Sequence, residues 1–181
     1  SNEINLNDIL IKEKNNKFEV KNLLLSKKFK IKSISNVNFN YLDKEELKNE
    51  LSIKKNDKNY LLDSKSFNAT KIIDDLLNSD KNSDSKKIFQ NNFKLDVKIE
   101  EAFLDKDHLV EDLNGYLTFK DSEVTDANLV GNFSDSQRIN FAVRSTSNEK
   151  ITTLYSDIAK PFVNRYKFIK GFEEGNLNFH S

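Results

Sequence analysis

The feature that most constrains the fold of this chain is a strict alternation of apolar and polar residues. Its clearest instance is residues 93–99, where Phe, Leu, Val and Ile alternate with Lys, Asp and Lys. Because successive side chains of a strand point to opposite faces, this pattern predicts a strand with one apolar and one polar face. Shorter stretches repeat the alternation: residues 29–31, 37–41, 51–53, 117–119, 127–129, 139–143 and 177–179.

Polar residues occupy the turn positions between these stretches. The chain has 4 Gly and 1 Pro, and Asp, Asn, Ser and Lys take the place of Gly at residues 56–58, 120–122 and 134–136. We therefore predict a mainly β (α+β) fold, in which hairpins build an antiparallel sheet with one solvated face. On the other face one apolar set should lie together: Phe93, Leu95, Val97, Ile99, Leu117, Phe119, Leu129, Phe141 and Val143.

Residues 68–77 follow a helical period instead. Their apolar members, Ile72, Ile73, Leu76 and Leu77, fall on one helical stripe. The stripe follows Asn68, whose side chain is of the type that caps helix N-termini. We expect a short helix here that packs on the apolar face of the sheet. The polar stretch that follows it, residues 78–92, is predicted to be a flexible loop.

A second short helix is predicted within residues 156–166, where Ile158, Phe162 and Val163 share a face. Proline is comfortable only in the first turn of a helix, because it lacks the backbone donor. Pro161 therefore implies that the helix begins after residue 156 or opens irregularly. Its apolar side chains should also lie against the sheet.

Composition sets the size of the core and excludes several classes of function. The 14 Phe side chains can supply a core, but only 36% of the residues are hydrophobic and the mean hydropathy is −0.69. We expect a thin core and a sheet or groove with one wet face. The 29 basic residues balance 29 acidic ones, which argues against a nucleic-acid-binding surface. Without cysteine the chain has no disulfide, thiolate zinc site or cysteine nucleophile.

No residue pattern points to catalysis. The chain has two histidines, His108 in a charged turn, where we expect exposure to solvent, and His180 near the end. Paired carboxylates at residues 74–75, 100–101 and 173–174 are sequence neighbours, and such neighbours do not face one another on a helix or strand. Gly-rich phosphate loops and G-x-S-x-G elbows do not occur. We predict a protein that is not an enzyme and has no metal or cofactor.

The chain has no methionine and begins Ser1-Asn2, which is typical of the scar left by a removed tag. We interpret residues 1–181 as a single fragment of a larger domain. Its apolar runs are shorter than the roughly 18 residues of a membrane-spanning helix.

Four stretches follow one another in a characteristic order. Residues 60–69 combine a strand with the start of a small helix, and residues 93–103 open a new set of hairpins. Residues 112–119 and 126–131 form a further hairpin, and residues 154–177 close the series as strand, helix and strand. This order resembles the AsmA-like family, the C-terminal region shared by AsmA, YhdP and TamB-type envelope proteins of Gram-negative bacteria.

The sequence departs from the family pattern at several turns. Asn68 replaces the usual Asp, Lys160 replaces a Gly, and Glu174-Gly175 replaces Gly-Gly. An Asn-Gly pair is ordinarily a strong hairpin-turn signal. The resemblance instead implies that Asn114-Gly115 lies inside a strand, with Gly115 at a bulge or a close approach of two backbones.

The resemblance implies a long, curved antiparallel sheet with an apolar concave face, and the two short helices predicted above should pack on that face. It also implies a periplasmic location, with the full-length protein anchored in the inner membrane by a helix outside this sequence. The expected function is a non-enzymatic part of a hydrophobic β-groove for phospholipid transport or outer-membrane lipid homeostasis. The expected partners are phospholipid acyl chains and, through the parent protein, the inner membrane, with no nucleic acid.

Apolar residues of the predicted strands are the candidates for lining such a groove. Those before residue 68 are the best placed, since no predicted helix follows them to cover that face. Two alternatives remain: a structural or adhesive β-module of the cell envelope without ligand and, more distantly, a hydrolase of envelope material. The groove candidates are Phe29, Ile31, Val37, Phe39, Leu51, Ile53, Leu95, Val97, Leu117, Phe119 and Phe141.

Overall fold

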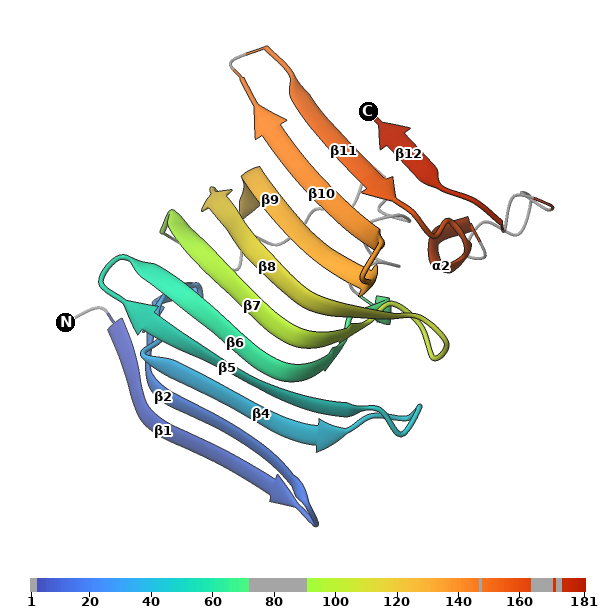
Figure 1. Ribbon diagram of the computed structural model, residues 1–181. Coiled ribbons are helices and arrows are strands. Elements are labelled where there is room, and N and C mark those ends of the chain that lie inside the picture. The colour runs from blue at the N-terminus through green and yellow to red at the C-terminus, as the bar shows by residue number, and fades with distance from the viewer. Residues whose placement is uncertain (1–2, 72–90, 147, 164–170, 172–173) are drawn as a thin grey trace.

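The protein forms one curved sheet of twelve strands, seen in a computed structural model (Figure 1). The structure describes residues 3–71, 91–146, 148–163, 171 and 174–181. Strands make up 71% of the described residues, which confirms the mainly β fold predicted from the alternation.

Most of the strands are long. Turns at residues 57–58, 121–122 and 135–136 separate adjacent strands, within the stretches 56–58, 120–122 and 134–136 predicted as turns. The elements are β1 (Glu3–Glu13), β2 (Asn16–Ser26), β3 (Ile31–Ser33), β4 (Asn36–Leu42), β5 (Lys48–Asn56), β6 (Asn59–Asn68), β7 (Phe93–Phe103), β8 (Leu109–Lys120), β9 (Glu123–Ser134), β10 (Gln137–Ser145), β11 (Lys150–Ser156), α2 (Lys160–Val163) and β12 (Leu177–His180).

The strands lie in the sheet in the order of the chain, except that β3 pairs only with the end of β2. Neighbours are antiparallel at every junction but one, because β6 and β7 are parallel. A purely antiparallel sheet is therefore the wrong prediction at this junction. Parallel neighbours require a long crossover connection, and residues 69–92 between the two strands provide that length.

The strand register places the predicted apolar set on one face. Val97 pairs with Gly115, Gly115 with Leu129, and Leu129 with Phe141, so these positions share a face. Extending these pairs in both directions gives one row that crosses the sheet from edge to edge. We call it the apolar row: Ile9, Val20, Val37, Ile53, Leu62, Val97, Gly115, Leu129, Phe141, Leu154 and Phe179.

The main core lies on this face beneath β7–β12. Phe162 of α2 is 4% exposed and belongs to the core cluster, as does Leu104 from the loop after β7. The predicted packing of the second helix on the apolar face is thus confirmed for Phe162. The cluster consists of Val97, Ile99, Ala102, Leu104, Val110, Ile139, Leu154 and Phe162.

The prediction of two short helices is wrong, since the described residues contain one, α2. It begins at Lys160, which puts Pro161 in the first turn as its chemistry requires. The other predicted helix falls mostly on residues 72–77, which lie outside the described residues, as does most of the predicted loop 78–92. At its start, Asn68 Oδ1 accepts a hydrogen bond from the Thr70 amide at 3.0 Å, as a capping side chain does.

Gly115 lies within β8, as the family resemblance implied, and not in a turn. Its φ is +149°, and a Cβ added there would lie 1.9 Å from the backbone oxygen of Asn128 on β9. Only glycine allows the two backbones to approach this closely. The register also shifts next to it, between Glu111 and Asn114.

Candidate functional site

The apolar face is the largest candidate site, and its two halves are buried to different extents. In the N-terminal half the centre of the face is closed, since Val20, Val37 and Leu51 are 5–9% exposed. The aromatic side chains beside them remain half-buried, with the rings of Phe18 and Phe39 4.6 Å apart between centroids. Solvent therefore reaches this half of the face along its aromatic residues.

A groove of about 550 Å³ opens at one end of the apolar face. Its aromatic members come from the starts of β6 and β7. The rings of Tyr60 and Phe93 meet edge to face at 5.2 Å, and Phe93 stacks on Phe119 at 4.8 Å. The groove is lined by Glu3, Leu24, Ile31, Lys32, Ser33, Lys55, Asp57, Lys58, Tyr60, Asn91, Asn92 and Phe93.

The segment that contains β3 forms one wall of this groove. The Ile34 amide donates a hydrogen bond to the Tyr60 hydroxyl at 3.3 Å, and Asn91 Nδ2 donates to the Lys32 carbonyl at 2.8 Å. The first contact joins Ile34, just after β3, to Tyr60 in β6, 26 positions later in the chain, and the second joins Lys32 in β3 to Asn91, which precedes β7 and lies 59 positions later. The groove is therefore built by tertiary contacts between distant parts of the chain.

Charged side chains surround the apolar lining. Lys32 Nζ forms an ion pair with Glu3, whereas Lys55, Asp57 and Lys58 come from the exposed tip of the β5–β6 hairpin. The groove therefore combines an apolar patch of Leu24, Ile31, Tyr60 and Phe93 with a larger set of polar and charged residues.

Most of the predicted groove residues lie on the apolar face. Ile31 lines the groove itself, and Phe119 contacts its lining through Phe93. The register places Val37, Phe39, Leu51, Ile53, Leu95, Val97, Leu117 and Phe141 on the same face.

Phe29 is the exception, and its assignment to a groove-lining strand is wrong. It lies in the turn between β2 and β3, its side chain is 73% exposed, and its φ is +56°. Its amide donates a hydrogen bond to the carbonyl of Ser26, which closes the turn. A pattern of three residues was too short to distinguish this turn from a strand.

The sequence reasoning missed Leu24, Tyr60 and Phe93 as groove residues, and missed β1 and β2 as strands. The alternation of Phe18 and Val20 with charged residues in β2 was the available signal for that strand. No pattern within a single segment predicts that these three residues line one groove, because they lie on three different strands that the sheet brings together.

A second, shallower hollow of about 770 Å³ lies over β8–β10. The side chains around it are mostly polar, and Lys94 Nζ lies 4.8 Å from the centre of the Tyr116 ring. Its lining contains Tyr116, Asp126, Ala127, Asn128, Asn140, Ala142, Arg144, Ser145 and Thr146. It offers hydrogen-bonding groups but no apolar lining comparable with that of the groove.

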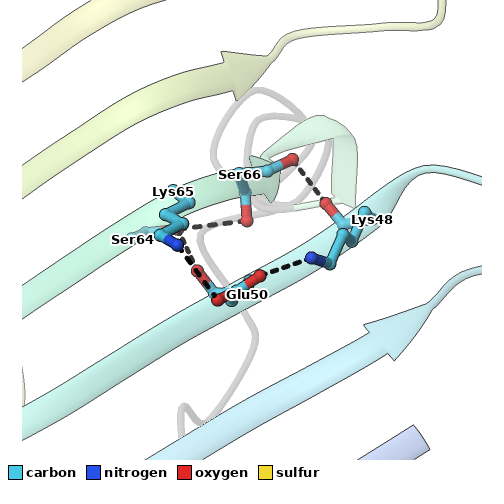
Figure 2. Close-up of polar contacts among 5 residues, drawn as sticks. All are labelled: Lys48, Glu50, Ser64, Lys65 and Ser66. Carbon is cyan, nitrogen blue, oxygen red and sulfur yellow. Dashed lines mark hydrogen bonds and ion pairs between the residues drawn. The ribbon is translucent and has the colours of Figure 1, made fainter. Parts of the chain in front are cut away.

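Buried serines between β5 and β6 have a structural role (Figure 2). Ser64 Oγ lies 2.9 and 3.0 Å from the carbonyl oxygens of Glu50 and Ser66, which share its single hydroxyl hydrogen, and Ser66 Oγ donates to the Lys48 carbonyl. These contacts satisfy backbone carbonyls beside the register shift after Glu50. The hydrogen bond from Lys48 lowers the pKa of the Glu50 carboxyl, and Lys65 lies 3.8 Å away on its other side.

A network of amides around Asp43 holds the opposite end of β5 and β6. Its Oδ2 accepts hydrogen bonds from Asn68 at 2.7 Å and Asn49 at 3.2 Å, and its Oδ1 accepts from two turn amides. Burial alone would raise the pKa of Asp43, but these hydrogen bonds outweigh it and lower the pKa. Asn49, which is fully buried, links Asp43 to the end of β6 through the Asn68 amide.

His108 is half-buried, so the prediction of an exposed histidine is wrong. Its ring Nδ1 lies 2.7 Å from Asp105 Oδ1, which also accepts the His108 amide at 2.8 Å. The histidine thereby closes the loop between β7 and β8. Within the described residues, no group of three or more His, Cys, Asp or Glu side chains could hold a metal ion.

No helix in the described part of the chain is long and apolar enough to cross a membrane. Comparisons of the chain with protein-family models, with curated proteins and with solved structures give no match. The apolar row and the groove beside it are therefore the features from which a function can be inferred.

Proposed function

We propose that this chain is a non-enzymatic segment of an AsmA-like envelope protein and binds phospholipid acyl chains along its apolar face. In the full-length protein this segment would lie in the periplasm, with an anchor in the inner membrane, and would contribute to lipid transport or outer-membrane lipid homeostasis. The observation that carries the proposal is the apolar row, which runs from edge to edge of a single sheet and lies beside an open groove.

The physical basis is the transfer of methylene groups from water to an apolar surface. Each buried CH₂ contributes about 0.8 kcal/mol, so a chain segment of several carbons is retained measurably. The half-exposed rings of Phe18 and Phe39 offer such a surface in the N-terminal half. The opposite face of the sheet is polar and remains in contact with water. In β4, for example, Val37 and Phe39 on the apolar face alternate with Asn38 and Asn40 on the polar face.

A photo-crosslinking amino acid placed on either face of β4 tests the proposal. At Phe39 it should capture phospholipid during expression in a Gram-negative host, whereas at Asn40, exposed on the other face, it should not. Mass spectrometry of the adduct identifies the lipid. Equal capture at both positions, or capture at neither, would contradict acyl-chain binding along this face.

A charge placed on the apolar face provides a second test. Phe39→Asp should abolish capture by a crosslinker at Ile31, while Asn40→Asp adds the same charge on the polar face and should leave capture intact. Circular dichroism must show the same strand content in both variants. Capture that persists in Phe39→Asp would place the lipid elsewhere.

The second candidate is a structural or adhesive β-module without ligand. The closed centre of the apolar row favours it, since the protein itself covers Val20 and Val37, which are only 5 and 7% exposed. If this candidate is correct, removal of lipid should not change the stability of the protein, and the photo-crosslinker at Phe39 should give no lipid adduct.

A further inference from the structure

We infer that the groove at Tyr60 and Phe93 binds the headgroup end of an anionic phospholipid. In this arrangement the phosphate lies near Lys55 and Lys58, and the acyl chains start over the aromatic rings. The inference rests on the proposed function, and adds to it the class of lipid and the end of the sheet at which the headgroup lies.

The position of Lys55 is the first support. Lys55 is the cross-strand partner of Tyr60 in the β5–β6 hairpin, so the two side chains leave the sheet on the same face. A cationic side chain thus stands on the apolar face beside an aromatic ring, where the lining of the groove meets solvent. An amphiphile needs this combination of apolar surface and adjacent charge.

The charge balance of the margin is the second support. Lys32 is paired with Glu3, whereas neither Lys55 nor Lys58 forms an ion pair with another described residue. Both are exposed, and Asp57 is the acidic residue between them. The hairpin tip therefore has an excess of positive charge that can attract a phosphate.

The two ends of β5 differ in charge, which fixes the expected orientation. The turn before β5 contains Asp43, Glu45 and Glu46 with one lysine, Lys44, while residues 54–58 at its other end contain three lysines and one Asp. An anionic headgroup is favoured at the basic end and repelled at the acidic end. Phosphatidylcholine carries a compensating positive charge and gains less from the lysines.

Native mass spectrometry of the delipidated full chain tests this inference with dioleoyl phosphatidylglycerol and dioleoyl phosphatidylcholine, which share their acyl chains. We expect the anionic lipid to bind about five- to tenfold more tightly at low salt, a preference that declines as salt screens the exposed lysines. The double variant Lys55→Glu/Lys58→Glu should remove this preference and retain residual binding of both lipids.

The matched control is Lys12→Glu/Lys14→Glu, which makes the same change in net charge at the exposed β1–β2 hairpin, at the far end of these strands from Glu3 and Leu24. It should keep the wild-type preference. Equal binding of both lipids by the wild type would overturn the headgroup site and leave the proposed function standing. Binding of neither lipid would overturn the proposed function itself. Competition by inorganic phosphate alone at equal concentration would show a free-anion site and overturn the lipid assignment.

Discussion

The N-terminal and C-terminal halves of the sheet follow the same alternating pattern but bury it differently. In β7–β12 the core cluster includes Leu104 and Phe162, both from outside the strands and both 4% exposed. In β1–β6 the aromatic rings of Phe18 and Phe39 stay half-buried, although Val20, Val37 and Leu51 at the centre of the face are closed. On the apolar face of β1, Ile11, which pairs with Phe18, is 58% exposed.

This difference shows that alternation specifies a face but does not close it. Around the core cluster of β7–β12, Phe162 of α2 and Leu104 of the loop after β7 complete the closure of this face. The open half retains apolar surface that a ligand can cover, and its groove lies where β3 passes beside Tyr60. The contrast between a closed and an open half predicts different costs for equivalent substitutions.

The largest expected effect is that of Phe162→Ala in the closed half. Truncation of a buried Phe removes its transfer free energy and leaves a cavity, at a cost of about 3–5 kcal/mol. Phe39→Ala in the open half should cost less, about 1–2 kcal/mol, because its ring is already partly in water. Urea unfolding of both variants measures the difference. Equal costs would show that the two halves are equally closed in solution.

Gly115→Ala should be the next most destabilising, at about 3 kcal/mol. The cost combines a backbone conformation that disfavours a side chain with overlap against the Asn128 carbonyl. Gly175→Ala is the matched control, since its φ is +102° but nothing lies within 4 Å of the added Cβ. Thermal unfolding should give Gly115→Ala a much lower melting temperature than Gly175→Ala. The reverse order of melting temperatures would disprove the close approach of β8 and β9.

The sequence predicted features that depend on neighbouring residues better than features that depend on contacts between distant parts of the chain. Alternation over residues 93–99 and 139–143 predicted strands and faces correctly, because the period of a strand is a local property. Gly115 was placed correctly through the family resemblance, against its local turn signal. The parallel junction of β6 and β7 was missed, because pairing direction depends on the path of residues 69–92.

The groove was predicted only in part for the same reason. Ile31 was a candidate because it lies in an alternating stretch, whereas Leu24, Tyr60 and Phe93 come together only after β2, β6 and β7 take their places in the sheet. Phe29 failed as a candidate because a short apolar–polar–apolar run also occurs in turns. A surface formed by distant strands has no signature in any one segment.

Asp43→Asn tests the polar end of the open half and should cost about 1–3 kcal/mol near neutral pH. In this variant an NH₂ group replaces the carboxylate oxygen that accepts hydrogen bonds from the side-chain amides of Asn49 and Asn68. Donors then face one another, and buried polar groups lose their hydrogen bonds. Denaturant unfolding in neutral buffer measures this cost. A loss below the error of the measurement would show that the network does not persist in solution.

The same variant predicts a difference in pH dependence. Because folding lowers the pKa of Asp43, its contribution is present above the unfolded-state pKa of about 3.9 and is lost as pH falls through the folded pKa. The wild type should therefore lose more stability on acidification than Asp43→Asn. Parallel slopes for the two proteins between about pH 5 and pH 3 would contradict the lowered pKa.

The smallest expected change in stability is that of Leu10→Lys at the free edge of the open half. Leu10 is 51% exposed and lies across from Glu19, so a lysine there loses little contact and gains an acidic neighbour. We expect a change within about 0.5 kcal/mol. Light scattering at high protein concentration should nevertheless fall, because charges on an edge strand oppose edge-to-edge pairing. Val20→Lys, in the buried row beside it, is the contrasting variant and should unfold the protein at much lower urea. If Leu10→Lys were as costly as Val20→Lys, the polar face of β1, on which Leu10 lies with Glu19, would have to be covered in solution.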